Sequence, residues 1–593
     1  MKKLDKSVGK VKKRNKEILT RANEFGEKAS DHFSTMFIQR LKNVREVRLW
    51  VVEWALLILV VLLLAIVQIF WYDSSYKTQA FVAGGEFTEA SLGDVKSMNP
   101  LYATTNSEKA LARLLFANLA SPDKSGHMKM ELAESATMSK DGKTWTVTLR
   151  DGLKWSDGEP ITADDILYTV KLMNDETAKT TVAIDFSRIK LQKVDERSVS
   201  FTLPTAYTDF TDSLEFPLIP AHILGEVSPA LVYEHDFSSN PVGSGAFALK
   251  AVQPGGGNNR FLQTIYMKRN ENFFGNESKL ASFNLRSYEK VEDIASAMKE
   301  ATVTATAEEV ELSDTKGVNR RTSLLNGGAF AFLNTKSPVL KSSAVRRGIQ
   351  QGVDMSAVRA EIDEMRWLDY PILETQEANL EYPELAKYDL EAAKKLLVDG
   401  GLKYNEEGRL CDEAGGLAEL RLAVRKRQPI QSVAERFKEE LQQLGFTVSL
   451  SVFDDTQPNM DFFASVLRPR DYDVLFYEID LGVSADPFIY YSSTQASGGG
   501  WNFSNYSNAL ADDALLTART SLDASLRETK YNSFLQRWVN DVPAIGLYQS
   551  AMNYYYQDGV RIFSDDALLT DVWDRFGDVE YWASSQEARM QTP

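Results

Sequence analysis

The sequence predicts an α/β protein with more than one lobe, preceded by a single membrane-spanning helix. Three observations predict this architecture. An uncharged apolar run of 19 residues lies near the N-terminus, at Trp54–Tyr72. The roughly 510 residues that follow alternate strand and helix patterns, hairpin-rich at first and strand–helix–strand later. The charge also changes sign at the apolar run, because residues 1–48 carry +8 whereas the remaining residues carry −24.

The composition of the 593-residue chain is that of a globular protein, with 44% hydrophobic and 25% charged residues. Its 83 Asp and Glu residues outnumber 67 Lys and Arg residues, which argues against nucleic-acid binding, since that function needs a basic face. The single cysteine, Cys411, excludes an intramolecular disulfide and any zinc site with several thiolates. The four histidines are scattered, so we expect neither a bound metal nor a cofactor.

The apolar run is long enough to cross a membrane as a helix. At about 1.5 Å per residue it covers about 28 Å, close to the roughly 30 Å hydrocarbon core. Trp50 and Trp54 flank one end and Phe70–Tyr72 the other, and aromatic rings favour membrane interfaces. A cleaved signal peptide is the alternative. However, the run exceeds the usual apolar length of roughly 7–15 residues, and no small-residue cleavage site follows at once.

The basic flank sets the predicted topology. Because residues 1–48 are positively charged, we expect a cytoplasmic tail there, a membrane helix at residues 49–72 and an extracytoplasmic remainder. Residues 73–84 are expected to form a short tether. The tail either lies along an anionic inner leaflet or remains solvated and only sets the orientation, and the second interpretation is the simpler.

Alternating hydrophobicity predicts strands in the first part of the outer region. Thr144–Leu149 and Ser198–Leu203 each place apolar side chains on one face, as half-buried strands do. Phe247–Val252 and Phe261–Met267 are separated by a glycine-rich segment whose residues tolerate positive φ. We expect these two segments to pair as a hairpin.

The second part of the outer region shows a strand–helix–strand pattern. Leu420–Val424 alternates, the apolar residues of Ile430–Leu444 recur at steps of three and four, and Phe446–Val452 alternates again. Gly445 is suited to end the helix. This pattern predicts a βαβ unit with a right-handed crossover. Tyr472–Tyr477 is almost continuously apolar, which favours a strand in a sheet covered on both faces.

Several polar residues have structural explanations. Thr162 and Asp165 have the spacing of a helix N-terminal cap, and Asp389 can cap a second helix. Asp164 and Asp165 are adjacent, so they do not face each other as an acid–base pair would. Trp155 is expected to pack in the core.

Catalytic motifs are absent from the sequence. It contains no Walker loop, no His-Glu-x-x-His motif and no nucleophile elbow, although Ser244 lies between two glycines. His127, His222 and His235 could meet in space, but nothing in their spacing favours a catalytic or metal triad. We therefore predict that the protein is not an enzyme.

The segment Leu149–Val170 (LRDGLKWSDGEPITADDILYTV) closely resembles the signature of family 5 extracellular solute-binding proteins, the oligopeptide- and dipeptide-binding group of ABC importers. Other segments fit the family pattern in order: Asn99–Leu101, Phe216–Leu224, Asn240–Phe247, Lys268–Gly275, Phe332–Asp354, Tyr388–Leu397, Asp486–Pro487, Asn502–Tyr506 and Asp541–Tyr548. Each segment alone is modest, but the ordered set is specific and covers roughly residues 82–560.

The resemblance implies a two-lobed fold of the periplasmic-binding-protein type (class II, cluster C) with an extra subdomain. Lobe I would take residues 82–327 and 544–593, and lobe II residues 328–543. An oligopeptide would be caught between the lobes, and the closed form would be presented to the permease subunits of an ABC importer. We expect a monomer that is held at the membrane by its N-terminal helix.

The resemblance also implies ligand-binding residues, which match cleft-facing positions of relatives: Ser244, Gly245, Asp480, Asp486, Trp501 and Asn502. One departure concerns the ligand's amino terminus. Peptide-binding relatives often anchor it with an aspartate three residues before an acidic–Pro pair, where this chain has Val483. Asp480 or Asp486 would have to take over that role.

Alternative functions stay open at this point. Relatives in the family also bind nickel complexes, opines and oligosaccharides, so a non-peptide solute is one alternative. The 48-residue inner tail motivates a second, a signalling or adhesion receptor that keeps the fold. A third, a membrane-anchored hydrolase, rests only on the segment Gly243–Gly245.

Overall fold

The computed structural model describes residues 44–182, 186–256, 260–312, 315–362, 366–377, 379–454, 461–497, 499–565 and 567–590. The chain divides into two compact units, and each is described by itself. One comprises residues 1–80 with 587–593, and the other residues 81–586.

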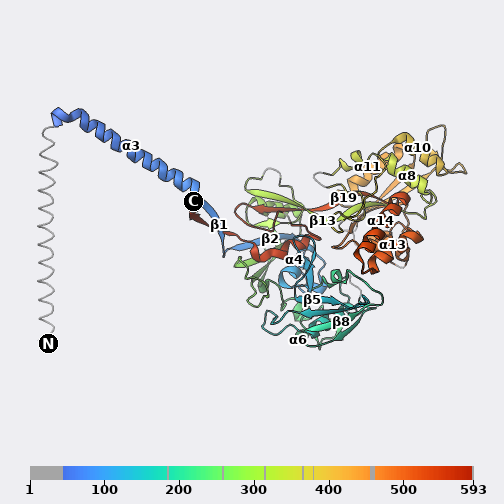
Figure 1. Ribbon diagram of the computed structural model, residues 1–593, viewed down its shortest axis with the longest axis horizontal. Helices are drawn as coiled ribbons and strands as arrows, with labels where there is room; N and C mark the ends of the chain where they lie inside the picture. Colours follow the sequence, from blue (N-terminus) through green and yellow to red (C-terminus); the bar gives the residue numbers. More distant parts are fainter. Residues whose placement is uncertain are drawn as a thin grey trace. The chain divides into compact units, whose positions relative to one another are not determined.

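The first unit contains one long helix, α3 (Val44–Tyr76), drawn in blue in Figure 1. Its stretch Trp50–Trp71 is long and apolar enough to cross a membrane, and none of that stretch is buried by protein. The residues predicted as a tether, 73–84, hold the end of α3 and strand β1 (Lys77–Val82), which pairs with β20 (Ser585–Met590). Most of the predicted basic tail, residues 1–43, lies outside the described residues.

The second unit is organised around one ten-stranded mixed sheet with the strand order β17-β16-β18-β13-β19-β12-β2-β11-β10-β9. The strands are β2 (Glu86–Leu92), β9 (Phe247–Pro254), β10 (Phe261–Arg269), β11 (Ser282–Tyr288), β12 (Ala305–Thr306), β13 (Val318–Leu333), β16 (Glu419–Arg425), β17 (Thr447–Phe453), β18 (Val474–Asp480) and β19 (Ala544–Gln557). The predicted hairpin is confirmed, since β9 and β10 pair in antiparallel register.

Strands β13 and β19 are the longest in the sheet and lie side by side at its middle (Figure 1). Their pairing register shifts between Leu324 and Gly328, which divides each strand into two parts. The C-terminal part of β13 pairs with β18, whereas the C-terminal part of β19 pairs with β12. The two strands therefore cross between two lobes, each with its own core, and we call them the crossover strands.

Lobe I is built on a large core that runs from Phe87 to Leu285 and takes in Met552–Trp582 from the C-terminal return. A second sheet, in the order β5-β6-β8-β7, belongs to the same core and forms the extra subdomain. Its strands are β5 (Ala133–Met138), β6 (Thr144–Leu149), β7 (Lys190–Lys193) and β8 (Ser198–Thr202), of which β6 and β8 were predicted. Because one core spans both parts, the subdomain is packed rigidly onto lobe I.

Lobe II confirms the predicted βαβ unit. Strands β16 and β17 pair in parallel, and α11 (Ile430–Gln443) connects them. Strand β18 is buried between two cores, with Phe476 in one and Leu475 in the other, as its continuous apolar sequence predicted. One face is covered by α8 (Ser343–Gly352), α9 (Met355–Arg359), α10 (Leu390–Asp399) and α11, and the other by α13 (Ala509–Thr520) and α14 (Ala524–Asp541).

The remaining helices and strands connect these layers: β3 (Ala120–Pro122), β4 (Met128–Met130), α4 (Asn106–Leu115), α5 (Ala163–Met173), η3 (Phe210–Leu214), α6 (Ala221–Leu224), α7 (Val291–Lys299), α8 (Ser343–Gly352), α9 (Met355–Arg359), α10 (Leu390–Asp399), β14 (Lys403–Tyr404), β15 (Leu410–Cys411), α12 (Phe488–Tyr491), α13 (Ala509–Thr520), α14 (Ala524–Asp541) and η8 (Val572–Tyr581). The predicted caps are present, since Thr162 and Asp165 form a capping box on α5 and Asp389 caps α10. Trp155 is fully buried, as expected.

Candidate functional site

A cavity of about 430 Å³ lies beside the crossover strands and is lined by both lobes. Leu324, Asn326 and Gln549 come from the crossover strands and Leu568 from the C-terminal return of lobe I, while most of residues 366–375 and Tyr382 come from lobe II. Such a volume suits a small solute or a few side chains of a longer one.

Two glycines allow the lobe II wall of this cavity to form. The segment around Leu368 lies directly on the crossover strands, and the Gln549 amide donates to the Arg366 carbonyl at 2.8 Å. A Cβ atom at Gly328 or Gly546 would collide with Leu368. Glycine at these two positions therefore allows the close approach that shapes the cavity.

The loop that follows β18 is fixed against the same strands. The Leu481 amide donates to the Asn326 carbonyl at 2.8 Å, and the Asn326 side chain donates to the Gly482 carbonyl at 3.1 Å. Gln376 holds the loop from the other side by donating to the Leu481 carbonyl at 2.6 Å. Both predicted aspartates, Asp480 and Asp486, lie on this loop, so its anchoring fixes their positions.

Asp480, at the end of β18, lies close to the lobe I carboxylates Asp571 and Glu215. Its carboxylate accepts a hydrogen bond from the Gly482 amide at 2.7 Å and has no cationic partner within ion-pair distance among the described residues. Its side chain reaches solvent, yet burial by the surrounding protein, helped by the negative charge of Asp571, raises the pKa of Asp480 to about 6. A solvent-exposed carboxylate without a cationic partner among the described residues favours a ligand that brings a positive charge.

Lobe I contributes further acidic groups near Asp480. Burial and the neighbouring Asp571 raise the pKa of Asp574 to about 7, and burial together with Asp574 raises the pKa of Glu215 well above its usual range. Arg113 on α4 is a nearby cation that is already paired with Glu131 at 3.0 Å, and Lys109 and Arg575 lie close to Asp571. We call Asp480, Glu215, Asp571 and Asp574 the acidic cluster; because a raised pKa favours the neutral carboxyl, its negative charge grows as the pH rises.

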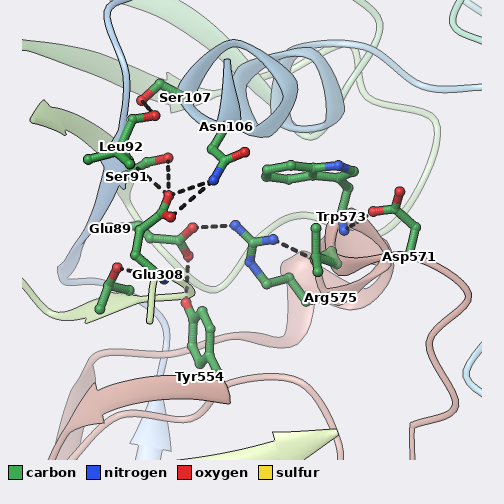
Figure 2. Close-up of polar contacts among 12 residues, drawn as sticks. Glu89, Ser91, Leu92, Asn106, Ser107, Glu308, Tyr554, Asp571, Trp573 and Arg575 are labelled. Atoms are coloured by element: carbon green, nitrogen blue, oxygen red, sulfur yellow. Dashed lines mark hydrogen bonds and ion pairs between the residues drawn. The ribbon is translucent and has the colours of Figure 1, made fainter. Parts of the chain in front are cut away.

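A buried trio holds the lobe I part of this cluster in place (Figure 2). The Glu89 carboxylate on β2 pairs with Arg575 at 2.5 Å and accepts a hydrogen bond from the Tyr554 hydroxyl at 2.5 Å. Arg575 also donates to the Val572 carbonyl at 2.5 Å in the first turn of η8. This turn carries Asp571 and Asp574, so the trio fixes the backbone that presents them.

A second cavity, of about 680 Å³, lies in lobe I and is lined by Arg113 and by Asp574 of the acidic cluster. Its lining mixes charged side chains with the aromatic pair Phe273 and Phe274, whose ring centroids lie 4.8 Å apart, and with Tyr581. It offers additional space next to the charged groups.

No sequence pattern singles out Glu215, Asp571 or Asp574 as site residues. Asp571 and Asp574 have the three-residue spacing of a helix cap, and they do form a capping box at the start of η8. That spacing predicts a helix start and carries no information about the acidic cluster. Glu215 lies far from both in sequence and has no local motif, so only the fold brings it close.

The Asp486 carboxylate, in contrast, already binds other side chains of the protein. Its carboxylate lies 3.3 Å from the Arg519 guanidinium and accepts a hydrogen bond from the Tyr207 hydroxyl at 3.3 Å. Val483, three residues before it, is buried. Of the two predicted aspartates, Asp480 is therefore the one without a cationic partner among the described residues.

The other predicted site residues lie in two separate places. Ser244 is buried, and its hydroxyl accepts a hydrogen bond from the Ala117 amide at 3.0 Å; a Cβ at Gly245 would collide with the backbone at the end of α4. Asn502 is fully buried, and its side chain bonds to the backbone of Ser492 and Tyr506.

Trp501 is 40% exposed and rests edge-on against Phe503, with a centroid distance of 5.7 Å. Among the six predicted residues, Asp480 and Trp501 are thus the ones whose side chains are accessible to solvent and free of polar partners other than the Gly482 amide.

The sequence is similar to those of known solute-binding proteins. A family model described as bacterial extracellular solute-binding proteins, family 5, middle part, matches residues 127–501. The oligopeptide-binding protein AppA of Bacillus subtilis is 23% identical over 491 residues, which cover 78% of this chain and 86% of AppA.

Solved structures share the fold. The structure of Bacillus subtilis AppA in complex with a nonapeptide superimposes with a TM-score of 0.66 at 20% identity, covering 85% of this chain and all of AppA. A periplasmic EDTA-binding protein, EppA, reaches a TM-score of 0.70 at 18% identity and covers 87% of this chain and 99% of EppA. These likenesses confirm the two-lobed α/β fold that the sequence predicted.

Proposed function

We propose, since this chain belongs to the family 5 bacterial extracellular solute-binding proteins, that it captures oligopeptides between its lobes and passes them to an ABC importer. The observation that carries the proposal is the cavity beside the crossover strands, to which both lobes contribute walls. A ligand that touches both walls stabilises the closed arrangement over the open one, which is the condition for capture by closure.

The peptide assignment is supported by the similarity to AppA, which is named as an oligopeptide-binding protein. We assign the ligand's amino terminus to Asp480, whose carboxylate has no cationic partner within the described part of the chain, and a ligand side chain to the exposed face of Trp501. Ser244, Gly245 and Asn502 would shape the walls through the backbone contacts described above.

The proposed division of the chain keeps the predicted boundaries, with lobe I at residues 82–327 and 544–593 and lobe II at residues 328–543. The protein would work as a monomer and as a receptor without catalytic activity. Helix α3 would anchor it in the cell membrane with the lobes outside, which confines the receptor close to its permease and raises the effective concentration there.

Calorimetric titration of the full chain in detergent micelles tests the ligand class. We expect peptides with a free amino terminus to bind, and the Asp480→Asn variant to bind them about tenfold more weakly, since a lost charge-assisted contact costs roughly 1.4 kcal/mol or more. Acetylated peptides provide the matched control, because they carry no charge for Asp480 to pair with. Equal loss for free and acetylated peptides would remove Asp480 from the amine site.

A non-peptide solute is the second candidate, since the fold is shared with the EDTA-binding protein EppA. The acidic cluster disfavours a polyanion of that kind, because Asp480, with a pKa of about 6, is mostly ionised at pH 7 and would repel it. Binding of EDTA or of a nickel–histidine complex in the same calorimetric assay, without binding of any peptide, would favour this candidate.

The membrane and partner assignments need a separate experiment. Extraction of native membranes with mild detergent should recover the uncleaved chain together with permease subunits. An N-terminus that begins after Tyr72 would identify α3 as a removed signal sequence. A partner set without permease subunits would favour the signalling or adhesion receptor.

A further inference from the structure

The two lobes contact each other at a second place, which is formed by residues outside the crossover strands. On the lobe I side it involves the loop after β8, residues 207–212, which belongs to the extra subdomain. On the lobe II side it involves Ser484, Asp486, Arg519 and Arg527. We call this set of residues the latch.

Arg519 lies at the centre of the latch. Its guanidinium stacks over the rings of Tyr207 and Phe488, at 4.5 Å and 4.8 Å from their centroids, and pairs with Asp486 at 3.3 Å. Its backbone carbonyl also accepts hydrogen bonds from the amide and the hydroxyl of Thr208, at 3.4 Å and 3.3 Å. One lobe II residue thus makes stacking, ionic and backbone contacts that reach the subdomain.

Two more carboxylates of the subdomain loop take part. The Asp212 carboxylate accepts a hydrogen bond from the Ser484 amide at 3.1 Å. Asp209 lies 3.8 Å from Arg527, whose guanidinium also pairs with Glu377 at 3.2 Å. Opposite-charge pairs and hydrogen bonds therefore run along the whole length of the loop.

An apolar contact completes the latch. Gly142, in the turn between β5 and β6, has a φ of +69°, and a Cβ built there would lie 3.2 Å from the Leu522 side chain. Leu522 follows α13 of lobe II, so this turn of the subdomain packs against lobe II as well. Because the subdomain shares one core with lobe I, these contacts connect lobe I to lobe II as rigid bodies.

We propose that the extra subdomain closes the receptor, and that Arg519 is the positioning residue that holds lobe II against it while a ligand is enclosed. The inference rests on the proposed function for the enclosed ligand. Capture would then depend on two separate attachments between the lobes, the flexible crossover strands and the latch.

The latch should also respond to acid, because closing it surrounds carboxylates with protein. Burial raises the pKa of Asp209 and of Asp212 to about 6, and it also raises the pKa of Asp486. The charged groups facing them are Arg527 and Glu377 at Asp209, and Arg519 at Asp486; Asp209, Asp212 and Asp486 also repel one another.

The sign of the acid response follows from these shifts. Opening returns Asp209 and Asp212 to water, where a carboxyl group has a pKa of about 3.9. The closed state therefore binds more protons between about pH 4 and 6. Closure is favoured at pH 5 and loses this contribution as the pH rises through 6.

Distance measurements between spin labels test the proposal. The labels are placed on exposed residues of the full chain through Val194→Cys in the subdomain and Leu510→Cys in α13, in a Cys411→Ser background. We expect Arg519→Gln to add a population with longer distances and to raise the peptide dissociation rate about tenfold. Arg519→Lys, which keeps the charge, should recover part of both. Arg537→Gln, an exposed arginine of the same lobe, is the matched control and should change neither.

The outcomes separate this inference from the proposed function. Distances are recorded without ligand, so a shift in Arg519→Gln supports the latch even if no peptide binds. Equal distance distributions in Arg519→Gln and Arg537→Gln would overturn it. Tyr207→Phe gives a second, milder test if Arg519→Gln does not fold.

On going from pH 7.5 to 5 the wild type should shift to shorter distances, and an Asp209→Asn, Asp212→Asn variant should shift less; an equal shift would overturn the acid response.

Discussion

A carboxylate, an arginine and a tyrosine meet at two places in this protein, with different surroundings. Glu89, Arg575 and Tyr554 form a trio inside lobe I, where their exposed fractions are at most 1% (Figure 2). Asp486, Arg519 and Tyr207 form a trio between the subdomain and lobe II, where the Arg519 side chain keeps 27% exposure. In each trio the arginine also faces the tyrosine ring.

The difference lies in what each trio connects. The buried trio joins β2, a crossover strand and η8, which are parts of one core. The latch trio joins two bodies that are linked elsewhere by the crossover strands. Breaking the first should therefore lower the free energy of unfolding, whereas breaking the second should mainly shift the balance between closed and open states.

The largest expected effect comes from breaking the buried trio. Glu89→Ala leaves the Arg575 guanidinium buried without a counter-charge, so we expect the free energy of unfolding to fall by about 3–5 kcal/mol. Urea unfolding of the full chain in detergent, followed by tryptophan fluorescence, measures it. The double variant Glu89→Ala, Arg575→Met should lose less than the sum of the two single changes. A loss below about 1 kcal/mol would show that the pair is not desolvated as described.

Removing the tyrosine hydroxyl from each trio should change the free energy of unfolding by a smaller amount. Tyr554→Phe removes the hydroxyl that pairs with one Glu89 oxygen in a dry core, which should cost about 1–3 kcal/mol of unfolding free energy. Tyr207→Phe removes the equivalent hydroxyl at the latch, where water can replace it, and should cost less than about 1 kcal/mol. The same urea experiment compares them, and a larger loss for Tyr207→Phe would reverse the interpretation.

Removing the latch carboxylate tests the other half of the comparison. Asp486→Ala should lower the free energy of unfolding by no more than about 1 kcal/mol, since Arg519 can reach solvent once the lobes separate. The peptide dissociation rate, measured by stopped-flow dilution, should nevertheless rise several-fold. A strong loss of stability with an unchanged dissociation rate would place Asp486 among the purely structural residues.

The smallest effect is expected at Trp501, which is 40% exposed and belongs to neither trio. Trp501→Ala should change the free energy of unfolding by about 0.5 kcal/mol or less. If its free face touches ligand, calorimetry will record weaker binding of peptides with bulky side chains and an unchanged affinity for alanine peptides.

The sequence predicts the strands, helices and caps whose formation depends on residues close together in the chain. The strands at Thr144–Leu149 and Leu420–Val424, the helix from Ile430 and the cap at Thr162 follow from patterns of two to four residues, and all are present. The two-lobed fold was accessible through an ordered series of motifs. The apolar run at Trp54–Tyr72 became part of α3 for the same local reason.

The site was less accessible, because its members are far apart in the chain. Glu89 and Arg575 are separated by 486 residues, and Tyr207 and Asp486 by 279, so no periodic pattern relates them. Asp486 stood out in the sequence because a proline follows it, but nothing local indicated that Arg519 and Tyr207 would engage its carboxylate. Whether it contacts ligand as well stays a prediction.

Capture of peptides between the lobes can be tested by native mass spectrometry of the full chain. The chain is released from detergent micelles in the presence of a mixture of free-amine peptides. We expect a mass increase of one peptide per chain, and a clear loss of that adduct in the Asp480→Asn variant. A chain that carries no peptide under these conditions, but does carry a nickel complex or an EDTA molecule, would contradict capture of peptides between the lobes.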